Sequence, residues 1–451
     1  MEDSLRLPPR EDNKLRFEDR VAHDWYRFVL SYPAHLVRSY LDRFDIQPGQ
    51  TVLDPFCGTG TTLVECKKLG VRSVGLDPNP VAVLASRVKT DWSVEPEALV
   101  GHASEIARLT NAKLRAQGID EAGQLPLFQR GARPTPKLRT LPDEVAKLLL
   151  TQSISPLPLH KTLTLLETLG EREDQRFSGI ERLALAKSLV TNVGNLHFGP
   201  EVGVGRPKSD ADVVSSWLAG VRTVAGDLEG LRDLSMVESM VHQADAREIA
   251  QVVRANSVDA VITSPPYPNE KDYTRTTRLE SVLLGFVKTK EDLRSLKRAL
   301  VRSNTRGVYI NDTDDLLVEG HIEIQRIARA IEARRIELGK TSGFERLYAR
   351  VAKLYFGGIK RHLLALRSVL RPGACLAYVV GDQASYLRVM IRTGEIIADI
   401  ASSVGYEVVG IDLFRTRLAT ATKEQLREEV VVLRWPKTNP GPGLGKKRSA
   451  T

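Results

Sequence analysis

The chain has 451 residues, enough for two or three domains. Its hydrophobic share of 42% and charged share of 27% are typical of a soluble globular protein, and no apolar run approaches the roughly 18 residues that span a bilayer. The first residues lack the pattern of a signal peptide, so we expect a cytoplasmic location. Three cysteines without a C-x-x-C spacing exclude a disulfide framework and argue against a structural zinc site. The net charge of +9 slightly favours a polyanionic partner such as a nucleic acid over simple solubility charge.

The first part of the chain has the pattern of an α/β unit. Residues 15–45 are helix-like and are followed by a turn at Pro48-Gly49. A short apolar strand, a glycine-containing loop, a helix and a second strand then follow in order, at residues 51–53, 54–60, 61–69 and 72–76. This order is typical of the start of a doubly wound α/β fold.

Two stretches interrupt the alternation and predict insertions. Residues 96–239 are mostly helix-like, with an extended basic segment at 131–137 and a glycine-rich loop at 195–208, and residues 288–345 are helical and rich in charge. We therefore expect one α/β domain built from residues 15–95 and 240–436, followed by a basic, disordered tail at 437–451. Its second half is expected to contain a strand at 258–262, a helix at 355–370, a strand at 374–380, a helix at 387–404, and an antiparallel pair of strands at 406–414 and 429–433.

The glycine loop is the first candidate site. It consists of Asp54-Pro55-Phe56-Cys57-Gly58-Thr59-Gly60-Thr61-Thr62 and directly follows the first strand. Glycines in a strand-to-helix turn let the backbone approach a ligand closely, and Asp77 has the place of the acidic residue that binds ribose hydroxyls in dinucleotide folds. Leu63 replaces the third glycine of a dinucleotide fingerprint and no Gly-Lys-Ser/Thr follows, so neither a nicotinamide site nor a Walker loop is indicated. Taken alone, a glycine pair is explained equally well as a tight turn.

The second candidate site is Ser264-Pro265-Pro266-Tyr267, which follows the apolar strand at 258–262. An exocyclic amine on cytosine or adenine is a poor nucleophile because its lone pair is delocalised into the ring. The Ser264 hydroxyl and the Pro265 carbonyl can accept its two N–H bonds, and Tyr267 offers a flat face for stacking a base flipped out of a duplex. Methylation at cytosine carbon-5 instead needs a thiolate, and Cys57 in the glycine loop is better explained as a small buried residue.

These motifs resemble those of the DNA amino-methyltransferases, which modify cytosine-N4 or adenine-N6. The glycine loop is similar to the D-P-F-x-G-S/T-G-T-T cofactor motif of that family, Asp77-Pro78-Asn79-Pro80 to its acidic second-strand motif, and Ser264–Tyr267 to its S/D-P-P-Y motif. A helix carrying Ser31-Tyr32-Pro33 resembles the element that encloses the methionine part of the cofactor, and Gly381-Asp382-Gln383 resembles a later strand-end motif. The resemblance covers residues 15–90 and 240–435.

The resemblance implies a Rossmann-like class I methyltransferase fold, which is a mostly parallel seven-stranded sheet with an antiparallel last strand, here with helical insertions. It implies S-adenosylmethionine as the cofactor and double-stranded DNA as the partner. The residues that it assigns to catalysis are Ser264, Pro265, Pro266 and Tyr267. Those that it assigns to cofactor binding are Asp54, Pro55, Phe56, Gly58, Gly60, Thr61, Asp77, Asn79 and Asp245, the last as an acceptor for an adenine amino group, although an aspartate there is also explained as a helix cap.

The resemblance leaves the target open between four candidates. A serine in the S/D-P-P-Y motif is usual for cytosine-N4 enzymes, but many of these place that motif before the cofactor motif, so adenine-N6 is the nearest rival. An RNA methyltransferase of the tRNA guanine-N2 type uses related chemistry, although no appended RNA-binding module is recognisable. A non-catalytic DNA-binding defence subunit is disfavoured by the intact Asp77, Ser264 and Tyr267. Restriction-modification is the usual setting of such enzymes, which makes a cognate restriction endonuclease a candidate partner.

Basic and aromatic residues after the second motif are candidates for contact with DNA. One group lies at 271–278 and another at 288–306, where positive charges outnumber negative ones. Solvated charges on helices explain any single position equally well. The candidates are Lys271, Tyr273, Arg275, Arg278, Lys297, Arg298 and Arg302. The second group, or the glycine-rich loop within 96–239, is where we expect the target sequence to be read.

Overall fold

A seven-stranded sheet lies at the centre of the computed structural model, which describes residues 15–28, 31–120, 136–198, 202–418 and 425–437. The strand order is β5-β2-β1-β6-β7-β9-β8. The pairings are parallel from β5 to β7, and β9 is antiparallel to both its neighbours. The strands are β1 (Thr51–Asp54), β2 (Arg72–Leu76), β5 (Ser239–His242), β6 (Val258–Thr263), β7 (Leu370–Gly381), β8 (Glu407–Leu418) and β9 (Gln425–Arg434). The expected α/β class, with a mostly parallel seven-stranded sheet, is confirmed.

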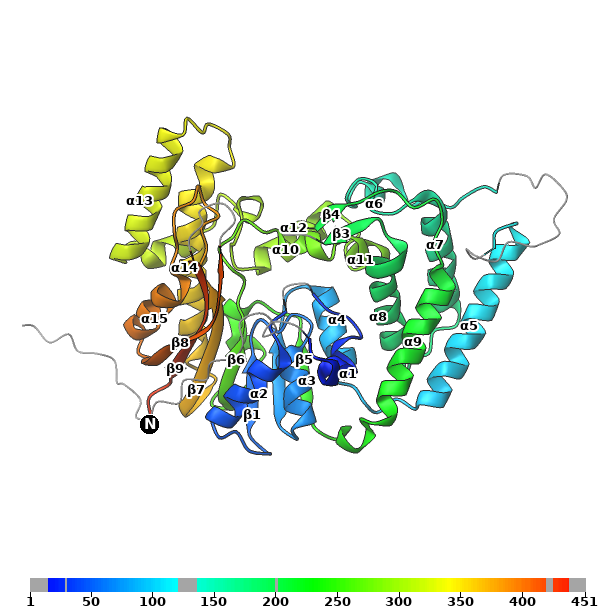
Figure 1. The fold of residues 1–451 in the computed structure, drawn as a ribbon, viewed down its shortest axis with the longest axis horizontal. Coiled ribbons are helices and arrows are strands. Elements are labelled where there is room, and N and C mark those ends of the chain that lie inside the picture. The colour runs from blue at the N-terminus through cyan, green and yellow to red at the C-terminus, as the bar shows by residue number, and fades with distance from the viewer. Residues whose placement is uncertain (1–14, 29–30, 121–135, 199–201, 419–424, 438–451) are drawn as a thin grey trace, which may run out of the picture.

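Helices cover both faces of the sheet, as the alternation of buried residues in its strands requires. In β1, Val52 belongs to a core with one set of helices, whereas its neighbour Leu53 belongs to a core with another set on the opposite face. The first set is α2 (Ala34–Arg43) and α3 (Thr61–Lys68), and the second is α13 (Ile322–Glu337), α14 (Tyr348–Leu366) and α15 (Thr393–Ser403). Figure 1 shows α13, α14 and α15 beyond β7 at one end of the molecule.

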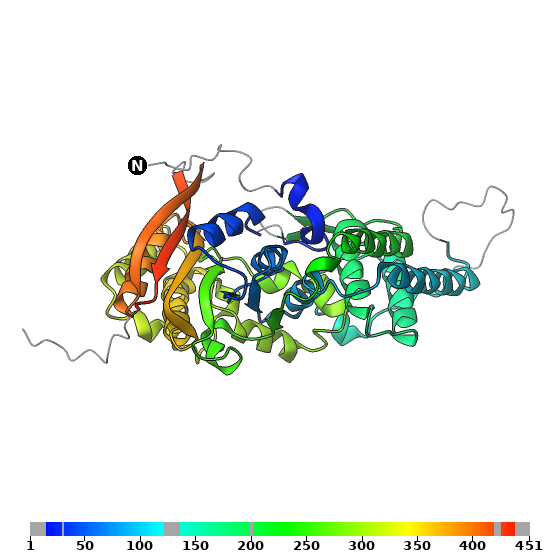
Figure 2. The ribbon, with the colours of Figure 1, turned by 90° about the horizontal axis from the view of Figure 1, so that it is seen from below.

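A second group of helices lies at the other end, beside β5 (Figures 1 and 2). All of its helices except the short α6 share an apolar core with α4 (Pro80–Lys89), so that the group packs directly on the α/β unit; Trp217 and Leu165 are buried in that core. The helices are α5 (Pro96–Ala116), α6 (Asp143–Ala146), α7 (Pro156–Glu171), α8 (Ser178–Ser188) and α9 (Val213–Glu229). No helix in the described ranges is long and apolar enough to cross a membrane.

Short elements lie above the carboxyl edge of the sheet and join the two ends of the molecule (Figure 1). They are the antiparallel hairpin of β3 (Leu196–Phe198) and β4 (Val202–Val204), and the helices α10 (Tyr273–Thr276), α11 (Arg278–Leu283) and α12 (Lys290–Ala299). A further short helix, α1 (Arg20–His23), precedes the sheet in the sequence.

Several expected elements differ from the structure. Residues 195–208 contain the hairpin β3–β4 and are not a simple loop. Ser31-Tyr32-Pro33 lies outside any helix, because Pro33 has extended backbone angles and caps the start of α2. The helix expected at 387–404 begins only at Thr393, after a turn in which two residues have positive φ. The segment 131–137 and the tail 437–451 lie mostly outside the described residues.

Helix α14 packs so closely on the segment at Asp314 that only glycine fits at Gly357. A Cβ atom there would lie 1.8 Å from the Asp314 carbonyl oxygen, whereas a Cβ at Gly101 on the exposed face of α5 would meet nothing within 4 Å. We expect Gly357→Ala to lower the free energy of unfolding by about 2 kcal/mol or more through steric overlap, and Gly101→Ala to raise it by about 0.5–1 kcal/mol through helix propensity. Denaturant unfolding measures both; equal effects of the two substitutions would contradict this packing.

Candidate active site

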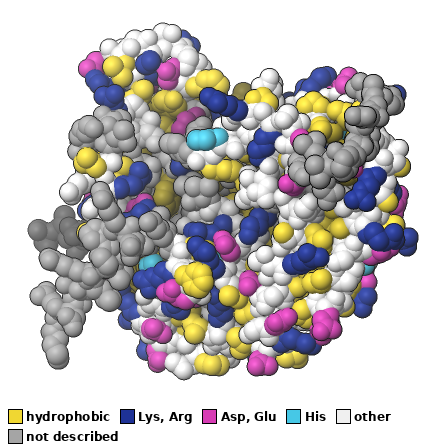
Figure 3. All heavy atoms as spheres, turned by 45° about the vertical axis from the view of Figure 1, so that its right-hand side comes forward, with side chains coloured by type: hydrophobic (Ala, Val, Ile, Leu, Met, Phe, Trp, Pro, Cys, Tyr) yellow, Lys and Arg dark blue, Asp and Glu magenta, His cyan; other side chains and the backbone are white. Residues whose placement is uncertain are grey.

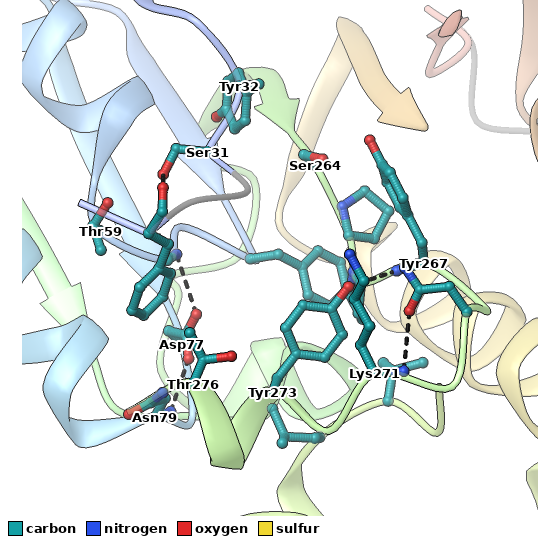
Figure 4. Close-up of a pocket in the computed structure, with 18 of the residues that line it drawn as sticks. Ser31, Tyr32, Thr59, Asp77, Asn79, Ser264, Tyr267, Lys271, Tyr273 and Thr276 are labelled. Atoms are coloured by element: carbon teal, nitrogen blue, oxygen red, sulfur yellow. Dashed lines mark hydrogen bonds between the residues drawn. The ribbon is translucent and has the colours of Figure 1, made fainter. Parts of the chain in front are cut away.

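A cavity of about 520 Å³ lies at the carboxyl edge of the sheet. The glycine loop after β1, Asp77 after β2 and Ser264–Tyr267 after β6 all contribute side chains to it (Figure 4). The two motifs, some 200 residues apart in the sequence, meet because β1 pairs with β6. Ligands of open α/β sheets bind at this edge.

The Asp54 carboxylate holds the two motifs together. Its Oδ1 accepts hydrogen bonds from the Thr263 hydroxyl at 2.6 Å and from the Phe56 amide at 3.1 Å, and its Oδ2 accepts one from the Tyr32 hydroxyl at 2.9 Å. Asp54 is completely buried, which raises its pKa. It does not line the cavity, so its position in the structure is that of a support behind the loop.

The glycine loop takes a shape that needs both of its glycines. Gly58 and Gly60 have φ of +50° and +82°, and a Cβ at Gly60 would lie 3.0 Å from the Ser86 hydroxyl oxygen of α4. Of the other predicted residues of this loop, Phe56, Gly58 and Thr61 line the cavity, whereas Pro55 and Gly60 do not.

Lys89, the last residue of α4, supports the glycine loop and is not among the predicted site residues. Its completely buried ammonium donates to the Thr59 carbonyl at 2.8 Å and to the Tyr26 carbonyl at 3.1 Å. It thereby joins the glycine loop to the N-terminal segment that carries Phe28 and Tyr32, both of which line the cavity. Burial lowers the Lys89 pKa to about 7. The helix α4 also contains Arg87, so no pattern in the sequence distinguishes Lys89.

Asp77 faces the cavity beside the glycine loop. Its two oxygens accept hydrogen bonds from the Gly58 amide at 3.1 Å and the Asn79 amide at 2.8 Å, which leaves further lone pairs for a ligand. Burial raises its pKa to about 7. Asn79 in turn caps α4 and donates from its side chain to the Thr277 hydroxyl at 3.0 Å.

Asp245 lines the cavity, but its carboxylate is already paired. The Arg247 guanidinium binds both of its oxygens, at 2.6–3.0 Å, and also binds Asp314 at 2.7 Å. The Arg247 amide donates to Asp245 as well, so that Asp245 acts as the cap of the following 3-10 helix. The helix-cap explanation of this aspartate is therefore confirmed, and a contact to a ligand would have to use the remaining lone pairs.

Ser264 and Tyr267 occupy the wall of the cavity formed by β6 and β7. The Ser264 hydroxyl donates its hydrogen to the Val379 carbonyl of β7 at 3.0 Å, which leaves its lone pairs available as acceptors. The Tyr267 amide donates to the Tyr273 hydroxyl at 3.2 Å, and Tyr273 itself lines the cavity (Figure 4). Pro265 and Pro266 complete the wall.

The six basic candidates form three pairs with different surroundings. Lys271 and Arg275 line the cavity together with Tyr273. Arg278 and Arg302 do not offer their charge to solvent, because they are only 9% and 5% exposed; their guanidinium groups bind protein carbonyls and, for Arg302, the carboxylate of Asp312. The structure therefore corrects the prediction that Arg278 and Arg302 contact DNA, because both side chains bind groups inside the protein.

The two remaining candidates also bind protein groups. Lys297 is paired with Asp272 at 2.9 Å and is largely buried. Arg298 is exposed and is paired with Glu291 at 3.0 Å. Of these two, only Arg298 lies where a phosphate could reach it without first breaking a buried ion pair.

Comparisons with known proteins agree with this geometry. The DNA methylase family model (N6_N4_Mtase) matches residues 8–86, which include the glycine loop and Asp77. The chain is 26% identical to the type II methyltransferase M.BsoBI of Geobacillus stearothermophilus, over 92% of this chain and 85% of that protein. It is 23% identical to M.AvaI of Nostoc sp., over 93% and 87%, and 44% identical to M.MjaII of Methanocaldococcus jannaschii over 15% and 13%.

The fold and the matches together support a methyltransferase. The matches support the DNA amino-methyltransferase family and methylation of an amino group in DNA. Family and fold imply S-adenosylmethionine as the methyl donor. The cavity fits that molecule, because Asp77 offers acceptors for ribose hydroxyls, the positive-φ glycines allow close approach of the backbone, and Phe28 and Phe56 provide apolar walls.

The raised pKa of Asp77 predicts pH-dependent cofactor binding. With a pKa of about 7, Asp77 is mostly protonated at pH 6 and mostly ionised at pH 8. Hydroxyl donors favour the ionised form, so the affinity for S-adenosylmethionine should rise by up to about tenfold between these values. Calorimetry on the wild type and on Asp77→Asn measures the change. The amino group of the ligand titrates in both, so an identical pH dependence in the two proteins would exclude a role for Asp77.

Proposed function

We propose that this protein transfers a methyl group from S-adenosylmethionine to the N4 amine of cytosine in duplex DNA. The observation that carries methyl transfer to a base amine is the orientation of Ser264, and the serine form of the motif favours cytosine over adenine. Because its hydroxyl donates to the Val379 carbonyl, it presents acceptor lone pairs to the same cavity that contains Asp77 and the glycine loop.

The cavity wall supplies what a base amine needs in order to react. S-adenosylmethionine, when bound, supplies an electrophilic methyl group. Ser264 and the Pro265 carbonyl accept the two N–H bonds of the amine, which concentrates its lone pair on nitrogen. Tyr267 stacks on the base, and Tyr273 holds the backbone of Tyr267 in place through the 3.2 Å hydrogen bond. A base inside a duplex cannot enter this cavity, so flipping of the nucleotide is part of the proposal.

Adenine-N6 is the second candidate target. The order of the motifs, with the cofactor loop first, differs from that of many cytosine-N4 enzymes, and a neutral serine hydroxyl can accept from either amine. The relatives described as type II methyltransferases support DNA over RNA as substrate. They also favour a role in restriction-modification, with a cognate endonuclease as partner and protection of host DNA as the biological result.

The helical group between β2 and β5 is proposed to take part in target recognition. Among the described residues of 96–239, only Phe198 and Val202 of the hairpin β3–β4 line the cavity. The Arg275 guanidinium donates to the Val202 carbonyl at 3.2 Å, so the hairpin is tied to the segment after Tyr267. Figure 3 shows Lys and Arg side chains, interspersed with Asp and Glu, on one face of the molecule.

The identity of the product tests the proposed target. Mass spectrometry of digested DNA from cells that express the chain should detect N4-methylcytosine, and Ser264→Ala should abolish most of it. DNA that carries only methyladenine would establish the second candidate. A wild-type chain that transfers no methyl group to DNA, while methylating RNA or nothing, would overturn the DNA reaction itself.

Separate substitutions should divide base binding from cofactor binding. Tyr267→Ala should lower kcat/KM for DNA by about 10- to 100-fold, because stacking of a base on an aromatic ring contributes roughly 1–3 kcal/mol, while the Kd for the cofactor stays within about twofold. Asp77→Ala should instead raise the cofactor Kd by about tenfold or more, because it removes charge-assisted hydrogen bonds. Steady-state kinetics with calorimetry distinguishes the two, and the reverse pattern would exchange the roles.

The hairpin should act on DNA and not on the cofactor. Phe198→Ala should weaken kcat/KM for DNA about 5- to 20-fold through lost apolar contact at the cavity, with an unchanged Kd for S-adenosylmethionine. Phe17→Ala is the matched control, since Phe17 is 81% exposed and does not line the cavity. If both substitutions leave DNA kinetics unchanged, the hairpin does not contact the substrate.

A further inference from the structure

A strained turn follows the catalytic wall at the end of β7. Leu387 and Arg388 are consecutive and have φ of +55° and +66°. Side chains with a Cβ rarely adopt this conformation, and glycine would adopt it without strain. Two such residues in succession persist only where the surrounding structure holds them, and strained backbone of this kind concentrates at functional sites.

The two ends of the turn are held together by a backbone bridge and by ion pairs to one buried carboxylate. Gln383 and Ile391 pair as an antiparallel bridge. Asp382 is 1% exposed and binds Arg392 at 2.5 Å on one side and Arg427 of β9 at 3.1 Å on the other. The ends of the turn are thus held at a constant separation, which accounts for the persistence of the strain between them.

The middle of the turn is attached to the segment that follows Tyr267. Tyr386 is completely buried, and its hydroxyl donates to the Ser303 carbonyl at 2.8 Å. The same carbonyl accepts the Glu270 amide at 3.0 Å. The turn and the base-binding segment therefore share one anchor, and movement of either would disturb the other.

The turn forms part of the cavity wall and carries one exposed arginine. Gln383 and Ser385 line the cavity, and a Cβ at Gly381 would lie 3.3 Å from the Tyr267 ring. Arg388, three residues beyond Ser385, is exposed. Within the part of the chain that the structure describes, its guanidinium has no ion pair or hydrogen bond, in contrast to Arg392 a few residues later.

We propose that Arg388 binds a backbone phosphate of the DNA beside the flipped base. The inference rests on the proposed function. A guanidinium matches a phosphate in geometry and charge, and phosphate contacts determine the orientation of a duplex on a protein. The strained turn places this arginine on a rigid support, so that little backbone freedom is lost when DNA binds.

Salt-dependent DNA binding tests the contact. The probe is a duplex oligonucleotide that carries the sequence found methylated in cellular DNA, titrated with the full chain by fluorescence anisotropy at several salt concentrations. Arg388→Ala should weaken binding about 3- to 10-fold at low salt and reduce the slope of log K against log salt by about one, as expected for the loss of one phosphate contact. The Kd of this variant for S-adenosylmethionine should not rise, and its melting temperature should not fall.

Two further variants keep the result interpretable. Arg388→Gly removes the charge while favouring the turn conformation, so it should show the same loss of affinity if charge and not folding is responsible. Arg72→Ala is the matched control, because Arg72 is an exposed arginine at the start of β2, on the opposite edge of the sheet. It should bind DNA like the wild type.

The outcomes separate this contact from the proposed function. A wild-type chain that binds and methylates DNA, together with Arg388 variants of unchanged affinity and slope, overturns the contact alone. An equal loss in Arg72→Ala also overturns it, since the effect is then one of net charge. A wild-type chain that neither binds nor methylates DNA overturns the proposed function and this contact with it.

Discussion

The hydrogen bond between the Thr263 hydroxyl and the buried Asp54 carboxylate is the contact on which the active site depends. It joins the ends of β1 and β6, so that the glycine loop and the Ser264–Tyr267 wall share one reference point. The Tyr32 hydroxyl binds the same carboxylate and brings the N-terminal segment to the same place. Burying the Asp54 carboxylate without these donors would cost free energy, so its hydrogen bonds keep the two motifs in fixed positions.

Hydrogen bonds on the two sides of the cavity lead to the same short segment, residues 273–277. On the cofactor side, Asp77 connects through Asn79 to the Thr277 hydroxyl. On the base side, the Tyr267 amide binds the Tyr273 hydroxyl, and α10 carries Tyr273 close to Thr277. The two halves of the cavity are therefore held by one short helix, as positioning a methyl donor against a base amine requires.

The parts of the chain that are not common to α/β sheets supply the contacts around this cavity. The hairpin β3–β4 and the turn after β7 both contribute residues to the lining of the cavity. Both are attached to the segment after Tyr267, one through Arg275 and the other through Ser303. Loops attached to a rigid core in this way can vary without disturbing the arrangement of the core.

The sequence by itself determined the α/β class and the two motifs, because a strand, a glycine turn and a Ser-Pro-Pro-Tyr run are local patterns; the mostly parallel sheet followed from the family resemblance that these motifs carry. It could not decide which charges are available: Arg278 and Arg302 have the same composition signal as Arg298, yet they are buried. Nor could it reveal Lys89, whose partners lie about 30 and 63 residues away. Burial and pairing depend on segments distant in the chain, so only the tertiary structure decided that Asp54 supports the loop from behind, while Asp77 and Ser264 face the cavity.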